Sequence, residues 1–220
     1  MENKEYLILD FGKVVAGPKT GEWFITPNFF NIVSKDKIEL EKLKEAIKKY
    51  SFYLSLPMHN EAEEFMCFSM FYNDILRELK YPVTDDVIEA LADDWTFNDE
   101  KFLFYNNIKS ELAYLKEKYQ LLMLTDNWPS VLRIMHNNDT YVFFKKIYVS
   151  SIYEAEKKNG IFFDYPISEY ELENRKVKFV DDDIINLEFA EKKGLTPIMM
   201  DRENNRPKVK YKTINSLFEL

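Results

Sequence analysis

The chain has 220 residues, of which 46% are hydrophobic and 31% are charged, and its formal net charge is −8. This composition is typical of a globular protein that buries a core of its own, and the acidic balance argues against binding nucleic acid along its phosphate backbone. Because the sequence has no membrane-length apolar run and no visible signal peptide, we expect a cytoplasmic protein without a membrane partner.

The N-terminal part predicts one strand followed by a helical region. Leu7, Ile8 and Leu9 form an apolar run before Asp10, as expected for a buried strand with a carboxylate at its end. The segment 16–35 is rich in glycine, proline and aromatic residues and predicts an irregular entry into a new region. Four later segments are predicted helices, from apolar spacing or capping residues: 37–50, 60–79, 84–95 and part of 99–119. Thr84 is the expected N-cap of the third helix, and no strand signal is present over 36–118.

The sequence changes character after residue 118. Four short apolar segments are predicted strands: 119–127, 145–151, 175–183 and 195–200. A helix is expected after the third of them, with Gly194 placed to end it. Strands that alternate with helices indicate a parallel sheet, which the N-terminal strand is expected to join. The expected fold is therefore an α/β core formed by residues 1–15 and 105–220, with an all-helical insertion at 16–104.

Polar residues stand at the predicted carboxyl ends of these strands. They are Asp10, Thr125, Asp126, Ser150, Ser151, Asp181, Asp182 and Asp183. Ligands of parallel α/β sheets bind beyond these strand ends. Consecutive aspartates repel one another unless a cation lies among them, and Mg²⁺ prefers such hard oxygen ligands together with a substrate phosphate. The arrangement also fits an aspartate nucleophile that forms a covalent intermediate.

Several other chemistries are excluded by what the sequence lacks. Two histidines and one cysteine cannot build a Cys/His zinc site, and a single cysteine cannot form an internal disulfide. The five glycines are not spaced for either Gly-rich phosphate loop, and no G-x-S-x-G motif is present. The DFG at residues 10–12 does not indicate a protein kinase, because no ATP-binding lobe precedes it and no H-R-D loop follows.

The order of these motifs resembles that of the haloacid dehalogenase superfamily, in particular its members with a helical cap inserted after the first motif. An aspartate ends the first strand, a threonine ends the second, a lysine follows the third, and paired acids end the fourth. The matching segments are LILDFGKVV, LLMLTDN, VSSIYEAEKKNGIFF and VKFVDDDIINLEFAEKKG. The third segment lacks the prolines of the family, and its lysine is assigned to Lys157, with Lys158 as the alternative. The resemblance implies a Rossmann-like core and a Mg²⁺-dependent hydrolase.

The resemblance also implies a role for each matching residue. Asp10 would be the nucleophile that attacks phosphorus, and Lys157 would pair with both the phosphate and Asp10. Thr125 and Asp126 would bind the phosphate. The implied Mg²⁺ ligands, directly or through water, are Asp10, the backbone carbonyl of Gly12, Asp182, Asp181 and Asn186. The implied activity is hydrolysis of a small phosphorylated metabolite through an aspartyl-phosphate intermediate.

Gly12 departs from the pattern, since phosphatases of this superfamily usually carry Asp-x-Asp and use the second aspartate to protonate the leaving oxygen. Loss of a general acid slows the chemistry by about 10²–10⁴-fold but leaves the nucleophile and the metal in place. Lys13 is not expected to replace it, because the motif should turn its side chain elsewhere. Two alternatives stay open: a carbon–halogen hydrolase, whose leaving halide needs no acid, and a non-catalytic member that binds a phosphorylated ligand or a protein partner.

Overall fold

The computed structural model describes residues 4–173, 175–206 and 208–220, which fall into two compact units. The core unit contains the chain up to Gly17, Phe104–Asn127 and Val131–Leu220, and the helical unit contains Pro18–Leu103 and Trp128–Ser130. The helical unit thus begins two residues later and ends one residue earlier than the sequence suggested, and it includes three residues that we had placed in the core. No helix among the described residues is long and apolar enough to cross a membrane.

The core unit contains a six-stranded sheet in the order β5–β4–β1–β6–β7–β8, and every neighbouring pair is parallel. The strands are β1 (Glu5–Leu9), β4 (Tyr119–Thr125), β5 (Phe144–Val149), β6 (Lys178–Asp181), β7 (Thr196–Met200) and β8 (Lys212–Ile214). The predicted α/β fold with a parallel sheet is confirmed. The prediction missed β8 and made three strands too long: β4 ends at Thr125 and not at residue 127, β5 ends at Val149 and not at residue 151, and β6 is shorter than 175–183 at both ends.

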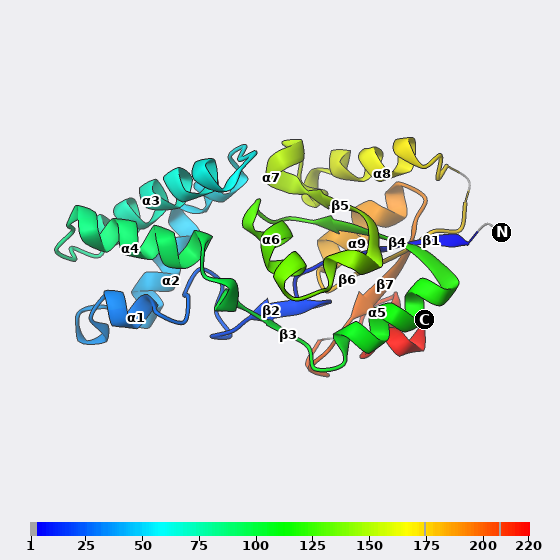
Figure 1. Cartoon of the computed structure of the whole chain (residues 1–220), viewed down its shortest axis with the longest axis horizontal. Helices are drawn as coiled ribbons and strands as arrows, with labels where there is room; N and C mark the ends of the chain where they lie inside the picture. Colours follow the sequence, from blue (N-terminus) through cyan, green and yellow to red (C-terminus); the bar gives the residue numbers. More distant parts are fainter. Residues whose placement is uncertain (1–3, 174, 207) are drawn as a thin grey trace. The chain divides into compact units, whose positions relative to one another are not determined.

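Helices flank this sheet (Figure 1). They are α5 (Ile108–Lys118), α6 (Ser130–Asn137), α7 (Ser150–Tyr153), α8 (Asp164–Glu169) and α9 (Ile184–Lys192). Ile8 and Phe179, from β1 and β6, belong to a buried cluster that also contains Phe163 and Leu187. The central strand β1 is buried on both faces, since Leu7, Ile8 and Leu9 are all fully inaccessible, as is usual in parallel sheets. This packing fixes the carboxyl end of β1, where Asp10 follows.

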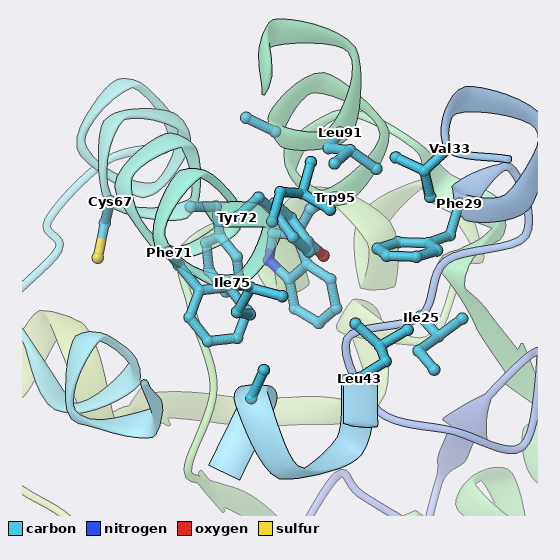
Figure 2. Packing of buried hydrophobic residues seen from close by; sticks show 14 of the residues in the cluster. Ile25, Phe29, Val33, Leu43, Cys67, Phe71, Tyr72, Ile75, Leu91 and Trp95 are labelled. Carbon is cyan, nitrogen blue, oxygen red and sulfur yellow. The ribbon is translucent and has the colours of Figure 1, made fainter. Parts of the chain in front are cut away.

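The helical unit is built from α1 (Phe29–Ile32), α2 (Leu40–Lys49), α3 (Glu61–Glu78) and α4 (Asp85–Thr96). Figure 2 shows its core, in which Phe71, Tyr72 and Trp95 pack together with aliphatic side chains from the other helices. Thr84 occupies the N-cap position of α4, but its side chain makes no capping hydrogen bond. The chain segments that connect the two units contain the short strands β2 (Ala16–Pro18) and β3 (Phe102–Phe104), which form a separate two-stranded sheet. The expectation of no strand over 36–118 was therefore wrong at β3.

A buried polar network explains why Trp128–Ser130 belong to the helical unit. Glu64, on α3, accepts hydrogen bonds from the Ser130 backbone N–H (2.7 Å) and from its Oγ (2.6 Å). The Lys101 ammonium donates to Ser130 Oγ (2.7 Å) and to the Trp95 carbonyl (2.6 Å), and it lies 3.5 Å from Glu64. Burial lowers the pKa of Lys101 to about 8, and the attraction of Glu64 opposes that shift. The segment that follows β4 is therefore held by charged groups of the helical unit.

Candidate active site

Asp10 and Lys157 form a buried ion pair at the carboxyl end of the central strand. Asp10 follows β1 directly, and its backbone N–H donates to Val180 of β6 (2.9 Å). Lys157, which begins a short 3₁₀ turn, places its ammonium 2.8 Å from Asp10 Oδ1 and 2.6 Å from Asp181 Oδ2. All three side chains are buried. A buried lysine needs such paired acids to remain charged, so this ammonium is committed to the two carboxylates.

The neighbouring Lys158 has a different environment. Its side chain is 63% exposed, and its ammonium pairs with Glu156 at 3.0 Å. Lys157, which the sequence analysis preferred to Lys158, is therefore the lysine beside Asp10. Its backbone N–H donates to Asp126 Oδ1 (3.1 Å), so that the carboxylate expected to bind phosphate also anchors the lysine turn.

Three aspartates come together at this edge of the sheet. Single carboxylate oxygens of Asp10, Asp181 and Asp182 all lie within 4.8 Å of one another. The oxygens of Asp181 are already occupied, because they accept hydrogen bonds from Lys157, from Asn186 Nδ2 (3.1 and 3.3 Å) and from a backbone N–H (2.8 Å). Asp182 is only partly buried and forms an ion pair with Arg206. The third acid of the DDD sequence, Asp183, caps α9, where its side chain accepts from the Ile185 N–H.

Burial makes this acidic cluster electrostatically costly. It raises the pKa values of Asp10, Asp181 and Asp182 to about 6. The attraction of Lys157 limits the shift at Asp10 and Asp181, and that of Arg206 limits it most at Asp182. Burial alone would lower the pKa of Lys157, but the attraction of Asp10 and Asp181 outweighs it and raises that pKa above its usual value. Crowded carboxylate oxygens that resist ionisation are the donor set that a hard divalent cation such as Mg²⁺ stabilises. The residues present therefore fit a Mg²⁺ site.

The loop after β4 is held from the end of β5. Thr125 is the buried last residue of β4, in register with Val149. Ser150 Oγ accepts from the Asn127 backbone N–H (3.1 Å) and donates to the Asn127 carbonyl (3.3 Å), and the Ser151 N–H also donates to that carbonyl (3.4 Å). Ser150 and Ser151 thus lie at the sheet edge as the sequence indicated, and their contacts position the loop that carries Thr125.

The chain turns sharply after Asp10. Lys13 has a left-handed backbone with φ of 53°, and its N–H donates to the Ala16 carbonyl (2.7 Å). Gly12 supplies no side chain to the site. Lys13 lines a cavity of about 410 Å³ together with Asp182 and Arg206. Sequence reasoning missed Arg206, which lies in the loop after β7, where no pattern indicates the direction of the chain.

Comparison with known proteins places the chain in a family. A family model described as haloacid dehalogenase-like hydrolase matches residues 32–200, so the chain belongs to the haloacid dehalogenase-like hydrolases. This match begins after Asp10. The assignment of Asp10 to the site therefore depends on its place at the end of β1 and on its contact with Lys157. A comparison with curated protein sequences gives no significant match.

Solved structures share the fold over nearly the whole chain. The HAD-hydrolase YfnB from Bacillus subtilis, solved with magnesium bound, has a TM-score of 0.70 and 14% identity, covering 99% of this chain and 97% of that one. A HAD phosphatase from Thermococcus onnurineus has a TM-score of 0.65 and 15% identity, covering 98% and 95%. L-2-haloacid dehalogenase from Xanthobacter autotrophicus has a TM-score of 0.68 and 10% identity, covering 97% and 95%. Phosphatases and dehalogenases are both among these structures, so the likeness establishes the fold and leaves the reaction to the chemistry of the site.

Proposed function

We propose that the protein is a Mg²⁺-dependent phosphatase that acts on a small phosphorylated metabolite, and not on nucleic acid or a membrane component. The observation that supports this proposal is that Asp10 lies close to Lys157 and to two adjacent acids, Asp181 and Asp182. Phosphoryl transfer requires a nucleophile in line with the phosphorus atom and positive charge around the transferred group. An aspartate, a buried lysine and a divalent-cation site supply both requirements.

In the proposed reaction a carboxylate oxygen of Asp10 attacks phosphorus, and the bond from phosphorus to the ester oxygen breaks. Water then hydrolyses the resulting acyl phosphate, which releases inorganic phosphate and restores the carboxylate. Because the pKa of Asp10 is about 6, the nucleophile is mostly ionised above pH 7. Lys157 keeps Asp10 charged in the resting site and neutralises phosphoryl oxygens during transfer. Thr125 and the loop at Asp126 are proposed to hold the phosphoryl group.

Asp10, Asp182 and the Gly12 carbonyl are proposed to hold Mg²⁺, which supplies charge neutralisation on the phosphoryl oxygens when bound. Asp181 and Asn186 are proposed to orient this group, because both Asp181 oxygens already accept hydrogen bonds from Lys157, Asn186 and the backbone. With Gly12 in place of the usual acid, the leaving oxygen must take its proton from the substrate, from water or from a residue of the helical unit. We therefore expect slow turnover of alkyl phosphates and faster turnover of esters with acidic leaving groups.

The alternative of a carbon–halogen hydrolase has one feature in its favour, since a halide leaves without a proton and would not require an acid at Gly12. Asp181 and Asp182 argue against it, because they fit a divalent-cation site and attack on carbon does not need a divalent cation. A non-catalytic member that binds a phosphorylated ligand is the other alternative.

The test is an assay of the purified protein with Mg²⁺ against a panel of phosphate esters and 2-haloacids. Asp10→Asn is compared with Asp139→Asn, which removes an exposed carboxylate of the same unit. Phosphate release that needs Mg²⁺, is lost in Asp10→Asn and survives in Asp139→Asn supports the proposal. Halide release with no phosphate release supports the dehalogenase. Turnover of no compound, with Mg²⁺ and inorganic phosphate still raising the melting temperature, supports the non-catalytic member and contradicts the phosphatase.

A further inference from the structure

We propose that the cavity beside Asp182 binds a second anionic group of the substrate, a carboxylate or a second phosphate, through Lys13 and Arg206. This inference rests on the proposed phosphatase function and narrows its substrate class to metabolites with two acidic groups. The cavity lies entirely within the core unit and has a volume of about 410 Å³. That volume is in the range of small-molecule sites, which span about 300–1,000 Å³.

Most charged groups in the cavity wall are already committed. Arg202 donates to both carboxylate oxygens of Glu111 (2.9 and 2.7 Å) and twice to the Val14 carbonyl (3.2 and 2.7 Å). Asp201 accepts from the backbone N–H groups of Asn205 and Arg206, at 3.1 Å each, and so holds its own loop. These groups shape the wall: the charge of Arg202 is balanced by Glu111, and the oxygens of Asp201 are occupied by backbone donors.

Lys13 is a cation of the cavity wall that is not committed to a hydrogen bond or an ion pair with any residue that the structure describes. Within the described part of the chain its ammonium forms no hydrogen bond and no ion pair, although it lines the cavity. Its φ of 53° is a conformation that glycine adopts without strain and that costs other residues roughly 1 kcal/mol. A lysine with a strained backbone and no hydrogen bond or ion pair of its own among the described residues, in a cavity wall beside Asp182, whose pKa its charge lowers, indicates a function for that charge.

Arg206 becomes a second available cation when the site is loaded. Its guanidinium now pairs with Asp182, the acid proposed to hold Mg²⁺. A divalent cation bound to Asp182 would neutralise the carboxylate with which Arg206 pairs. Neither Lys13 nor Arg206 would then have Asp182 to balance its charge. Glu203 is the remaining wall carboxylate, and it accepts a hydrogen bond from Asn205 Nδ2 (2.7 Å). Arginine and lysine that converge on one cavity suit an oxyanion, which arginine binds through two parallel hydrogen bonds.

The test measures binding without turnover, by isothermal titration calorimetry on Asp10→Asn in the presence of Mg²⁺. Two matched pairs of ligands serve as probes. Glycerate 3-phosphate and glycerol 3-phosphate differ by a carboxylate, and fructose 1,6-bisphosphate and fructose 6-phosphate differ by a second phosphate. We expect the ligand with the second acidic group to bind at least about tenfold more tightly in one pair, since charge-assisted bonds of this kind are worth about 1.5–3 kcal/mol. The pair that shows the preference identifies the group.

The preference should fall to about twofold or less in Lys13→Met and in Arg206→Gln, because each change removes one of the two charges. Lys13→Arg keeps the charge and should keep the preference, and Lys208→Met, an exposed lysine of the same loop outside the cavity wall, should not alter it. Equal affinities in both pairs, or a preference that survives both substitutions, would overturn the proposal. A binding preference for the second acidic group, without hydrolysis by the wild type, would contradict the phosphatase and support the anion site. Hydrolysis without such a preference would support the phosphatase and contradict the anion site.

Discussion

Replacing Lys157 with methionine is the most informative single change, because it leaves two buried carboxylates without their shared cation. The ammonium lies 2.8 Å from Asp10 and 2.6 Å from Asp181, and both acids are almost fully buried. Removing one partner of a buried ion pair costs about 3–5 kcal/mol, and since Lys157 has two partners we expect the upper end, about 5 kcal/mol at pH 8. Methionine has a similar length, so little of this cost comes from a cavity.

The cost should depend on pH in a defined direction. The pKa values of Asp10 and Asp181 in the folded protein are about 6, above their ordinary value of 3.8, and loss of Lys157 raises them further. An acid whose folded-state pKa is raised destabilises the fold when it is ionised, and this penalty decreases as the pH falls from that pKa toward the unfolded-state value of 3.8. At pH 5 both acids are neutral in the folded variant but largely ionised in the unfolded chain, so we expect the cost to fall below about 2 kcal/mol.

The assay is urea unfolding in EDTA at pH 8 and pH 5, followed by far-ultraviolet circular dichroism. Lys158→Met is the matched control, since it removes the adjacent exposed lysine and should cost no more than about 1 kcal/mol at either pH. Equal costs for the two substitutions, or a Lys157→Met cost that does not change between pH 8 and pH 5, would refute the buried pairing on which the candidate site depends.

Three further outcomes are expected. Mg²⁺ affinity, measured by calorimetry, should decrease as the pH falls through about 6, because protons then compete for Asp10 and Asp182; an affinity that is constant from pH 7.5 to 5.5 would contradict this. Lys101→Met should destabilise the helical unit by about 3–5 kcal/mol, and adding Glu64→Gln should restore part of the loss. All three tryptophans lie in that unit, so their fluorescence during urea unfolding reports this change directly. Lys13→Gly should raise the free energy of unfolding by about 0.5–1 kcal/mol through relief of its left-handed backbone, a gain that thermal unfolding would detect.

The parts of the fold that the sequence predicted are those with a long local pattern. β1 and β4 are continuous apolar runs, and α3 repeats apolar residues over 18 positions, so their type follows from the sequence alone. β2, β3 and β8 have three residues each, too few for a period to be recognised. These short strands form because neighbouring strands offer backbone partners, which is a tertiary cause.

The residues of the candidate site could also be predicted only in part. Asp10, Thr125 and the acids at 181–182 stand at strand ends, and strand ends of a parallel sheet meet at one edge, so their proximity could be predicted. Lys157 was preferred to Lys158 from the resemblance alone, and local pattern could not add to that choice, because it depends on which side chain a 3₁₀ turn directs into the core. Arg206 reaches Asp182 from a loop with no periodic pattern, and Glu64, Lys101 and Ser130 meet from three distant parts of the sequence.

The loop after β4 is held by contacts from two distant parts of the sequence. Asn127 is held by Ser150 in the core unit, whereas the next three residues belong to the helical unit, where Glu64 binds the first N–H of α6. Both sets of contacts were invisible in the sequence, because Ser150 lies 23 residues from Asn127 and Glu64 lies 66 residues from Ser130. The position of the loop that follows Thr125 is therefore a tertiary property, although Thr125 itself could be predicted from its place at a strand end.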